Sequence, residues 1–437
     1  MVQNEPEKRS REASSFSFDE SEVTTLPTAL PIKDGCALSF YVAYKSNRAR
    51  YGVLNLPHGR VDTPIFMPVA THGTIKGLDA TQVEELEVPI ILGNAYHLSS
   101  RPGEKIIEKF GSLHNFMGWR RNLLTDSGGF QMVSLIKLSK VTEDGVSFNN
   151  PYTNSNLLFT PEKSIDSQNS IGADIIMQLD DVVSAQSTDY ERIEEAVNRT
   201  TRWLDRCIKA HKNPDKQNLF AIVQGGIYKD LRKKSLKSLI ARDLPGYAIG
   251  GLSGGENKED FWQIIELCTR NGEGLPENKP RYVMGVGYPI DIIVCVAFGA
   301  DMFDCVYPCR TARFGTAMVH NGLLKLRLSK YKHDLRPLDQ NCDCYCCKNY
   351  SRAALHKLVL KDSLGSQLMT IHNIRFMMNF CREMRTAIKN DVFPEYCKTF
   401  IKNFYSSHEL DHLSEDERKK GIPKWIVDAL SSINIVF

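Results

Sequence analysis

The chain has 437 residues, of which 42% are hydrophobic and 24% are charged, and this composition is typical of a folded globular protein rather than a disordered one. Its net charge of +3 excludes a uniformly basic nucleic-acid coat but permits a local basic groove. The sequence has no run of about 18 apolar residues, so we expect no membrane span, and its first residues lack the apolar region of a signal peptide. We therefore expect its 12 cysteines to be reduced thiols and metal ligands rather than disulfides.

Residues 1–35 are polar and rich in Ser and Glu, so we predict a disordered tail. Beyond them, eight short apolar runs recur, at residues 63–70, 90–96, 122–126, 174–180, 219–224, 247–251, 281–287 and 301–306. Segments of helical period, such as 190–204, lie between most of these runs. Apolar strands without alternation, separated by helices, predict a parallel sheet, and eight of them favour an α/β fold, a closed (β/α)8 TIM barrel over residues 36–320.

The gap between the third and fourth runs is long. Within it, residues 133–148 have the pattern of a β-hairpin that turns at Asp144-Gly145. We predict a hairpin insertion near the mouth of the barrel.

A cysteine cluster follows the last apolar run. Cys342, Cys344 and Cys347 form a Cys-x-Cys-x2-Cys motif, and a later histidine would complete a closed set of four zinc ligands. His372 and His356 both compete for that fourth place, and Cys346 is interpreted as a spare thiol. Because a closed set leaves no open coordination position, the sequence predicts one structural Zn²⁺ rather than a catalytic ion.

Basic residues precede this cluster beside Tyr331, at Lys325, Arg327, Lys330, Lys332 and Arg336. We therefore expect residues 321–400 to form a zinc-binding, basic, RNA-contacting subdomain. Residues 401–437 have a helical, mostly amphipathic period and are predicted to form a C-terminal helical tail.

Polar groups gather at the predicted ends of the barrel strands, where such barrels hold their functional groups. They are Asn94, Asp126, Asp180, Gln224, Gly250-Gly251, Met284-Gly285 and Asp304. Two facing carboxylates suit glycosidic-bond chemistry, in which one attacks an anomeric carbon and the other exchanges protons with the leaving group. Asp180 and Asp181 are adjacent on a strand and point to opposite faces, so only one of them can enter the pocket.

A structural interpretation of the same residues stays open at this point. Asp304 could cap a turn, and Arg310 and Arg313 could be ordinary surface charge. A Gly-Gly turn beside an Asp, as in the segment 125–131, is also a common structural device.

Six motifs resemble those of the tRNA-guanine transglycosylases. They are Thr-Asp-Ser-Gly-Gly-Phe-Gln (125–131), Gln-Gly-Gly (224–226), Ile-Gly-Gly-Leu-Ser-Gly-Gly-Glu (249–256), Tyr-Val-Met-Gly-Val-Gly (282–287), Asp-Met-Phe-Asp-Cys-Val (301–306) and the Cys-x-Cys-x2-Cys…His set. The resemblance covers residues 38 to 400. Within the family, the chain resembles above all the catalytic subunits of the eukaryotic members.

The resemblance implies a base-exchange reaction on tRNA. Asp304 would be the nucleophile that attacks C1′ of the wobble guanosine, and Asp126 would be the general acid/base. The base and nucleoside would be bound by Asn94, Asp126, Ser127, Gly128, Gly129, Phe130, Asp180, Gln224, Gly251 and Met284. The RNA on either side would be held by Gly285, Val286, Gly287, Tyr288, Pro289, Ile290, Asp291, Cys309, Arg310, Thr311, Ala312 and Arg313. The zinc ligands would be Cys342, Cys344, Cys347 and His372.

The resemblance also implies substrates and partners. The incoming base would be queuine, with Gly254 leaving room for its cyclopentenediol arm where bacterial relatives carry a larger residue, and Val182 standing where they carry Cys. The tRNAs would be the Asp, Asn, His and Tyr acceptors with G-U-N anticodons. A non-catalytic paralogue would complete a heterodimer, located in the cytoplasm or attached peripherally to the mitochondrial outer membrane. The alternative is that this chain is itself that non-catalytic tRNA-binding subunit.

Overall fold

The computed structural model describes residues 37–129, 139–149, 156–406, 411 and 414–437. The predicted tail at 1–35, Phe130 and the first part of the predicted hairpin lie outside the described residues.

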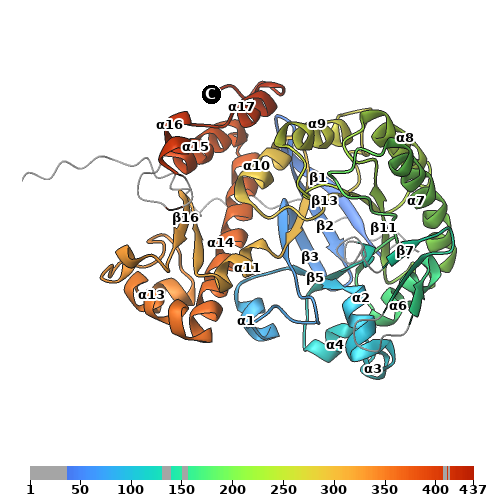
Figure 1. The fold of residues 1–437 in the computed structure, drawn as a ribbon, viewed down its shortest axis with the longest axis horizontal. Helices are drawn as coiled ribbons and strands as arrows, with labels where there is room; N and C mark the ends of the chain where they lie inside the picture. The colour runs from blue at the N-terminus through green and yellow to red at the C-terminus, as the bar shows by residue number, and fades with distance from the viewer. Residues whose placement is uncertain (1–36, 130–138, 150–155, 407–410, 412–413) are drawn as a thin grey trace, which may run out of the picture.

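Eight parallel strands form the centre of the molecule (Figure 1). They are β4 (Ile65–Pro68), β5 (Ile90–Asn94), β6 (Asn122–Asp126), β10 (Ile175–Met177), β11 (Asn218–Val223), β12 (Gly246–Ile249), β13 (Arg281–Val283) and β14 (Met302–Cys305). Their order is β4-β14-β13-β12-β11-β10-β6-β5, and a parallel bridge between Val69 and Leu92 closes the ring. The predicted (β/α)8 barrel is confirmed, because each predicted apolar run overlaps one of these strands.

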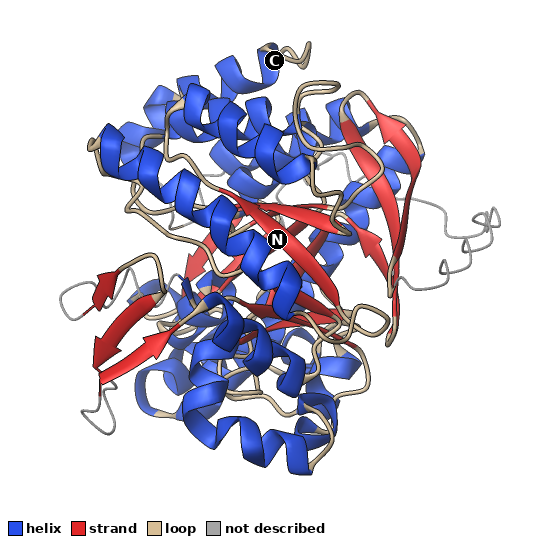
Figure 2. Cartoon of the chain, turned by 90° about the vertical axis from the view of Figure 1, so that its right-hand side faces the viewer, coloured by secondary structure: helices blue, strands red, loops and turns tan. Residues whose placement is uncertain are grey.

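Helices cover the outside of the barrel (Figure 2). Between β4 and β6 lie α1 (Ala80–Glu85), α2 (Ala95–Leu98), the π-helical turn η1 (Ser99–Gly103), α3 (Glu104–Lys109) and α4 (Leu113–Met117). From β9 to β14 the covering helices are α6 (Pro161–Ile171), α7 (Tyr190–Ala210), α8 (Lys229–Ile240), α9 (Lys258–Thr269) and α10 (Pro289–Ala297). Helix α7 shows why these helices pack on the barrel, since residues such as Ile193, Val197 and Leu204 form one buried apolar stripe.

An antiparallel sheet that the sequence analysis did not predict precedes the barrel. It consists of β1 (Ser39–Ser46), β2 (Ala49–Leu56) and β3 (Gly59–Thr63). Arg50 of β2 is 2% exposed and Asp301, at the start of β14, is 0% exposed, and the two form a buried ion pair. This pair attaches the sheet to the amino-terminal end of the barrel strands.

The predicted insertion is a three-stranded sheet rather than a two-stranded hairpin. Strands β7 (Ser139–Val141) and β8 (Val146–Asn149) form the hairpin around Asp144-Gly145, and β9 (Asn156–Phe159) pairs with β8. The carbonyl of Glu143 in the turn accepts a hydrogen bond from Trp203 Nε1 of α7 at 2.8 Å. The insertion is thereby held against the outside of the barrel.

The chain after β14 begins with α11 (Tyr307–Arg313), the hairpin β15 (Thr316–Val319) and β16 (Gly322–Lys325), and the 3-10 turn η3 (Ser329–Tyr331). It continues with α12 (Tyr345–Asn349), α13 (Arg352–Lys361), α14 (Ser363–Lys389), α15 (Phe393–Ser406), α16 (Glu415–Lys420) and α17 (Lys424–Ser431). Helix α14 packs against β4 and α11, so it completes the ring of helices. The expected boundary at residue 400 falls inside α15, and the one at 320 falls in the β15–β16 turn.

Replacing Arg50 with Met should destabilise the fold strongly, because it leaves the Asp301 carboxylate buried without its cation. We expect a loss of about 3–5 kcal/mol in the free energy of unfolding, measured by urea denaturation. Lys45→Met is the matched control, since Lys45 and Glu277 form an exposed ion pair. That control should lose no more than about 1 kcal/mol. An equally small loss for Arg50→Met would contradict a structural role of the buried pair.

Candidate active site and metal centre

Asp304 is held at the mouth of the barrel by two donors. The Tyr282 hydroxyl donates to Oδ1 at 2.5 Å, and the Gly285 N–H donates to the same oxygen at 2.8 Å. Gly285 has a φ of +75°, which glycine adopts at little cost. Among the described residues, Oδ2 has no hydrogen-bond donor, so this oxygen is available for attack. Burial raises the pKa of the carboxyl, and the two hydrogen bonds to Oδ1 oppose that rise.

Asp126 ends β6 and is fixed by the neighbouring strand. Its Oδ1 accepts from the Ala95 N–H at 2.9 Å, and its Oδ2 accepts from the Asn94 amide. Asn94 and Asp126 are also register partners at the ends of β5 and β6. The fold therefore brings Asn94 and Asp126 into direct contact, and their roles in substrate binding and catalysis stay predictions.

Both carboxylates lie at the carboxyl-terminal end of the parallel barrel strands. Strands β6 and β14 are separated by β5 and β4 in the closed ring, so Asp126 and Asp304 approach from different sides of the mouth. The pKa of the Tyr282 hydroxyl lies well above its usual value, first because of burial, then because of Asp304, and also because of the Asp126 charge. A single buried hydroxyl thus experiences the field of both acids.

Asp180 and Asp181 point to opposite faces, as predicted. Asp180 accepts from Ser127 Oγ at 3.0 Å and from Gln224 Nε2 at 2.7 Å. Asp181 instead pairs with Arg192 at 2.6 Å and with Arg199 at 2.5 Å on α7. Burial raises the pKa of Asp180 to about 6, while the bonds from Gln224 and Ser127 lower it. Asp180 is consequently an acceptor whose charge changes near neutral pH.

Gln224 and Gly251 meet behind Asp180, where little space remains. A Cβ at Gly251 would lie 2.3 Å from Gln224 Oε1, and Gly251 has a φ of +67°. The sequence analysis gave no role to Arg232, which is 0% exposed and joins the two loops. Its Nη1 donates to the carbonyls of Val223 and Gly250 at 2.8 Å each, and its Nε donates to Gly226 at 2.9 Å. Only the fold could identify this role of Arg232, because an Arg in a segment of helical period is ordinarily interpreted as surface charge.

The segment after β6 brings backbone close to the acids. A Cβ at Gly129 would lie 2.7 Å from Asp180 Oδ1, and Gly128 has a φ of +84°, so neither position accepts a side chain easily. Met284 is half-buried at the end of β13, with its sulfur 3.5 Å from a Cβ built on Gly250. Phe130, the predicted stacking partner of the base, lies outside the described residues.

Of the two positions expected to govern base choice, Val182 lies in the loop after β10 and Gly254 lies against that loop. The Cγ2 of Val182 would be 3.1 Å from a Cβ at Gly129. A Cβ at Gly254 would lie 3.1 Å from the Cβ of Ala185. A larger side chain at Gly254 would therefore press on this loop, and the role of Gly254 in base choice stays a prediction.

The predicted RNA-contacting segments are only partly accessible. Gly285 and Arg310 are exposed, and Tyr288, Asp291, Thr311 and Arg313 are half-buried. Asp291 pairs with Lys258 at 2.7 Å, and Arg313 Nη1 donates to the Cys309 carbonyl at 3.3 Å. The remaining positions have buried side chains and would support rather than touch RNA: Val286, Gly287, Pro289, Ile290, Cys309 and Ala312.

Three cysteines and one histidine form a metal-ligating cluster. The Nδ1 of His372 lies 3.6 Å from Cys342 Sγ, 3.7 Å from Cys344 Sγ and 3.3 Å from Cys347 Sγ. Its Nε2 hydrogen-bonds the Met318 carbonyl at 2.8 Å, which leaves Nδ1 free to ligate. These contacts decide between the two histidines, because His356 Nδ1 instead bonds the Leu326 carbonyl at 2.6 Å. The donor set fits a closed tetrahedral ion.

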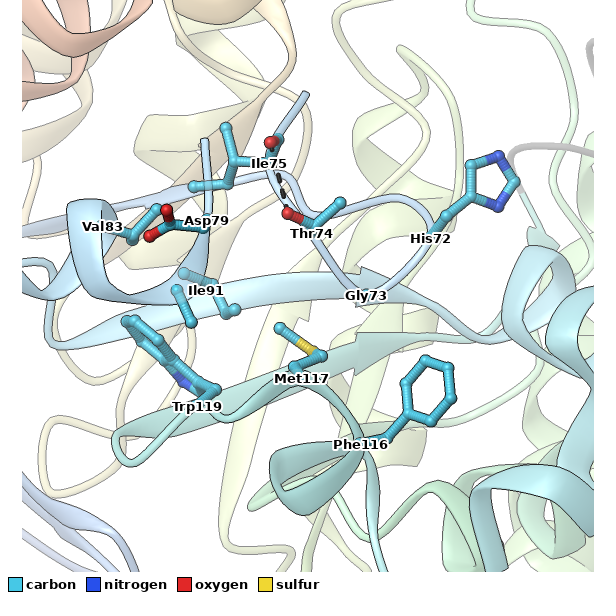
Figure 3. A pocket seen from close by; sticks show the side chains of 11 residues that line it. His72, Gly73, Thr74, Ile75, Asp79, Val83, Ile91, Phe116, Met117 and Trp119 are labelled. Atoms are coloured by element: carbon cyan, nitrogen blue, oxygen red, sulfur yellow. Dashed lines mark hydrogen bonds between the residues drawn. The ribbon is translucent and has the colours of Figure 1, made fainter. Parts of the chain in front are cut away.

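A cavity of about 280 Å³ is lined by residues other than Asp126 and Asp304 (Figure 3). It is formed by the loop after β4 together with α1, α4 and Trp119. Thr74 closes one side by donating to the Leu78 carbonyl at 2.7 Å. Its lining is mostly apolar, and the ionisable residues in it are His72 and Asp79.

The sequence matches the queuine tRNA-ribosyltransferase family over residues 45–406. The chain belongs to this family. It is 49% identical to the queuine tRNA-ribosyltransferase catalytic subunit of Schizosaccharomyces pombe, over 91% of this chain and 98% of that protein. It is 46% identical to the catalytic subunit of Caenorhabditis elegans, over 90% and 98% of the two chains. The bacterial queuine tRNA-ribosyltransferase of Caldanaerobacter subterraneus is 49% identical, over 85% and 99%.

Over the residues that the structure describes, the helices are too short or too polar to cross a bilayer.

Cys347→Ser should remove the ion bound by this cluster and lower the melting temperature, because a closed set loses one of four ligands. Elemental analysis should show one metal ion fewer per chain than in the unaltered protein. Cys346→Ala is the matched control, since its buried thiol lies next in sequence but outside the cluster. An unchanged metal content in Cys347→Ser would exclude Cys347 as a ligand.

Proposed function

We propose that this protein exchanges the wobble guanine of tRNAs with G-U-N anticodons for queuine, through a covalent Asp–ribose intermediate. The observation that carries the proposal is the pair Asp126 and Asp304, presented from different strands at one barrel mouth and both acting on Tyr282. The names of the relatives, tRNA-ribosyltransferases for queuine, support the substrate class.

The first displacement would begin at Asp304. Its Oδ2 attacks C1′ of the ribose, and the bond from C1′ to the guanine nitrogen breaks. Asp126 gives a proton to the departing guanine. The guanine therefore takes the electron pair of the broken bond and leaves as a neutral molecule. Tyr282 and Gly285 keep Oδ1 in place and stabilise the carboxylate before attack.

The second displacement would reverse these roles. Asp126 takes a proton from the incoming queuine, whose nitrogen attacks C1′ and releases Asp304. Two displacements at one carbon restore the original configuration, and the RNA chain is never cut. The nucleoside must leave its stack to reach the buried acids.

Base recognition would depend on the groups around Asp180. Its carboxylate accepts from the N–H groups of the base, and Gln224 and the Gly251 backbone donate to the base carbonyl. A side chain at Gly129 would collide with Asp180 and one at Gly251 with Gln224, so glycine at both positions keeps these two base-binding groups unobstructed. Met284, with Phe130 expected on the opposite face, would pack against the ring.

The cysteine cluster would hold one structural Zn²⁺ on Cys342, Cys344, Cys347 and His372. When bound, this ion supplies folding free energy and no open site for chemistry. The exposed Lys325, Arg327 and Lys332 lie on this subdomain and would contact RNA phosphates.

The assembly and location are proposed on the family names alone. We propose a heterodimer with a non-catalytic paralogous subunit, since the eukaryotic relatives are named catalytic subunits. The tRNA set would be the Asp, Asn, His and Tyr acceptors, and the location cytoplasmic or peripheral to the mitochondrial outer membrane. The alternative, that this chain is the non-catalytic partner, is disfavoured because Asp304 and Asp126 are both present and held in position.

Asp304→Asn should abolish exchange of labelled guanine into a G-U-N tRNA, by at least about a thousandfold, because the amide is a poor nucleophile. It should also abolish the covalent tRNA adduct on denaturing gels. Asp126→Ala should slow turnover by about 10²–10⁴-fold by removing the proton carrier. Asp243→Asn, which changes an exposed acid just before the amino-terminal end of β12, is the control and should retain base exchange. A gel-stable adduct in Asp304→Asn would refute the assignment.

The KM for the free base should depend on pH through Asp180. Because its pKa is about 6, the carboxylate becomes protonated below that pH and loses an acceptor for the base N–H groups. We expect KM to rise by about tenfold per unit as the pH falls below 6, and to be constant above 7. Asp180→Asn should have a high KM without this dependence. A KM for wild-type protein that is flat from pH 5 to 8 would argue against Asp180 as the base acceptor.

A further inference from the structure

A second cluster of metal-ligating side chains lies at the opposite end of the barrel. His58 stands in the turn between β2 and β3, His114 is on α4, and Asp174 directly precedes β10. One ligand atom from each lies within 4.8 Å of the others. The two imidazole rings are stacked with their centroids 3.8 Å apart and an angle of 15° between planes.

His114 is the informative member, because it is buried without satisfied nitrogens. It is 4% exposed, and among the described residues neither ring nitrogen has a hydrogen-bond partner. Its Nε2 lies 3.3 Å from Asp174 Oδ2, and that contact lacks hydrogen-bond geometry. A buried polar atom without a partner costs free energy of about 1–3 kcal/mol. Some other group should therefore satisfy His114.

The 3.3 Å separation is the spacing that a metal ion would impose. Ligand atoms bound at about 2.0–2.1 Å in tetrahedral geometry lie roughly 3.3 Å apart. His58 Nδ1 is 2.6 Å from Asp174 Oδ1, a hydrogen-bond length, and its ring is stacked on that of His114. Because an ion lies in the plane of each imidazole that binds it, the His58 ring would have to rotate out of the stack on binding. Its side chain is 39% exposed and sits in a turn, which permits that rotation and gives an ion a path from solvent.

We propose that His58, His114 and Asp174 bind a second divalent metal ion of the zinc class, with water completing its coordination. Two imidazoles and one carboxylate are an established donor set for such ions. The Leu123 N–H donates to Asp174 Oδ2 at 2.7 Å and orients the carboxylate, as outer partners of metal ligands commonly do.

This site would serve the fold rather than base exchange. Asp174 and Leu123 lie at the amino-terminal ends of β10 and β6, whereas Asp126 lies about 10 Å farther along β6, at its carboxyl-terminal end. An ion here would join the β2–β3 turn to α4 and to the strand that leads to Asp180. The expected consequence of binding is stability of the barrel's closed end.

The test counts zinc ions per chain. The full chain is incubated with excess Zn²⁺, freed of unbound ion by gel filtration and analysed by elemental mass spectrometry. We expect two ions in the unaltered protein, one in His58→Gln, one in Cys347→Ser and none in the double variant. His58 is suited to substitution because it lies in an exposed turn, where a changed side chain should not prevent folding. Circular dichroism should confirm that the variant is folded.

His333→Gln is the matched control, because His333 is exposed and belongs to neither cluster. It should retain two ions. Thermal melting provides a second measurement, since the second equivalent of Zn²⁺ should raise the melting temperature of the unaltered protein and not of His58→Gln. One ion in the loaded unaltered protein, or two ions in His58→Gln, would overturn the proposal. The first result would leave a His–Asp hydrogen bond alone at this site.

Discussion

The buried carboxylate of Asp301 fixes the strand that carries Asp304. It accepts from Arg50 Nε at 2.8 Å and from the Arg281 N–H at 2.7 Å, and its own carbonyl accepts from the Ile65 N–H at 2.8 Å. One residue thus connects β2, β13, β14 and β4. Three positions later the same strand reaches the mouth, where Asp304 meets Tyr282 of β13. Because both ends of β14 are bonded to β13, the nucleophile's position follows from the ion pair at the far end of the barrel.

Four of the barrel's acids show how burial and partners assign different tasks to one residue type. Asp301 and Asp181 are paired with arginines and serve the fold. Asp180 and Asp304 receive only neutral donors, so burial raises both of their pKa values. Neutral donors orient a carboxylate without neutralising it. Of these four acids, the two proposed to act on substrate are those that have no cationic partner among the described residues.

Much of the barrel was predictable because its strands are buried on both faces and appear in the sequence as unbroken apolar runs. The sheet β1–β3 was missed, since its strands lie before the first such run and were assigned no element. The third insertion strand, β9, was also missed, because residues 156–159 were assigned no element. Contacts between distant residues, such as Tyr282 with Asp304 or Arg232 with Gly250, depend on strand register and leave no pattern in the chain. His372 could be separated from His356 only once α14 was placed.

The metal-ligating cluster is connected to the nucleophile through α14. His372 ligates from that helix, and the next residue, Asn373, accepts from the Met318 N–H at 2.9 Å and donates to the Pro308 carbonyl at 2.9 Å. Pro308 lies in α11, four residues after Asp304. An ion at His372 would therefore stabilise α11, which presents Arg310, more directly than Asp304, which is held by β13. Loss of the ion should consequently impair tRNA contacts before it alters the reacting carboxylate, and this order follows from the hydrogen bonds rather than from distance.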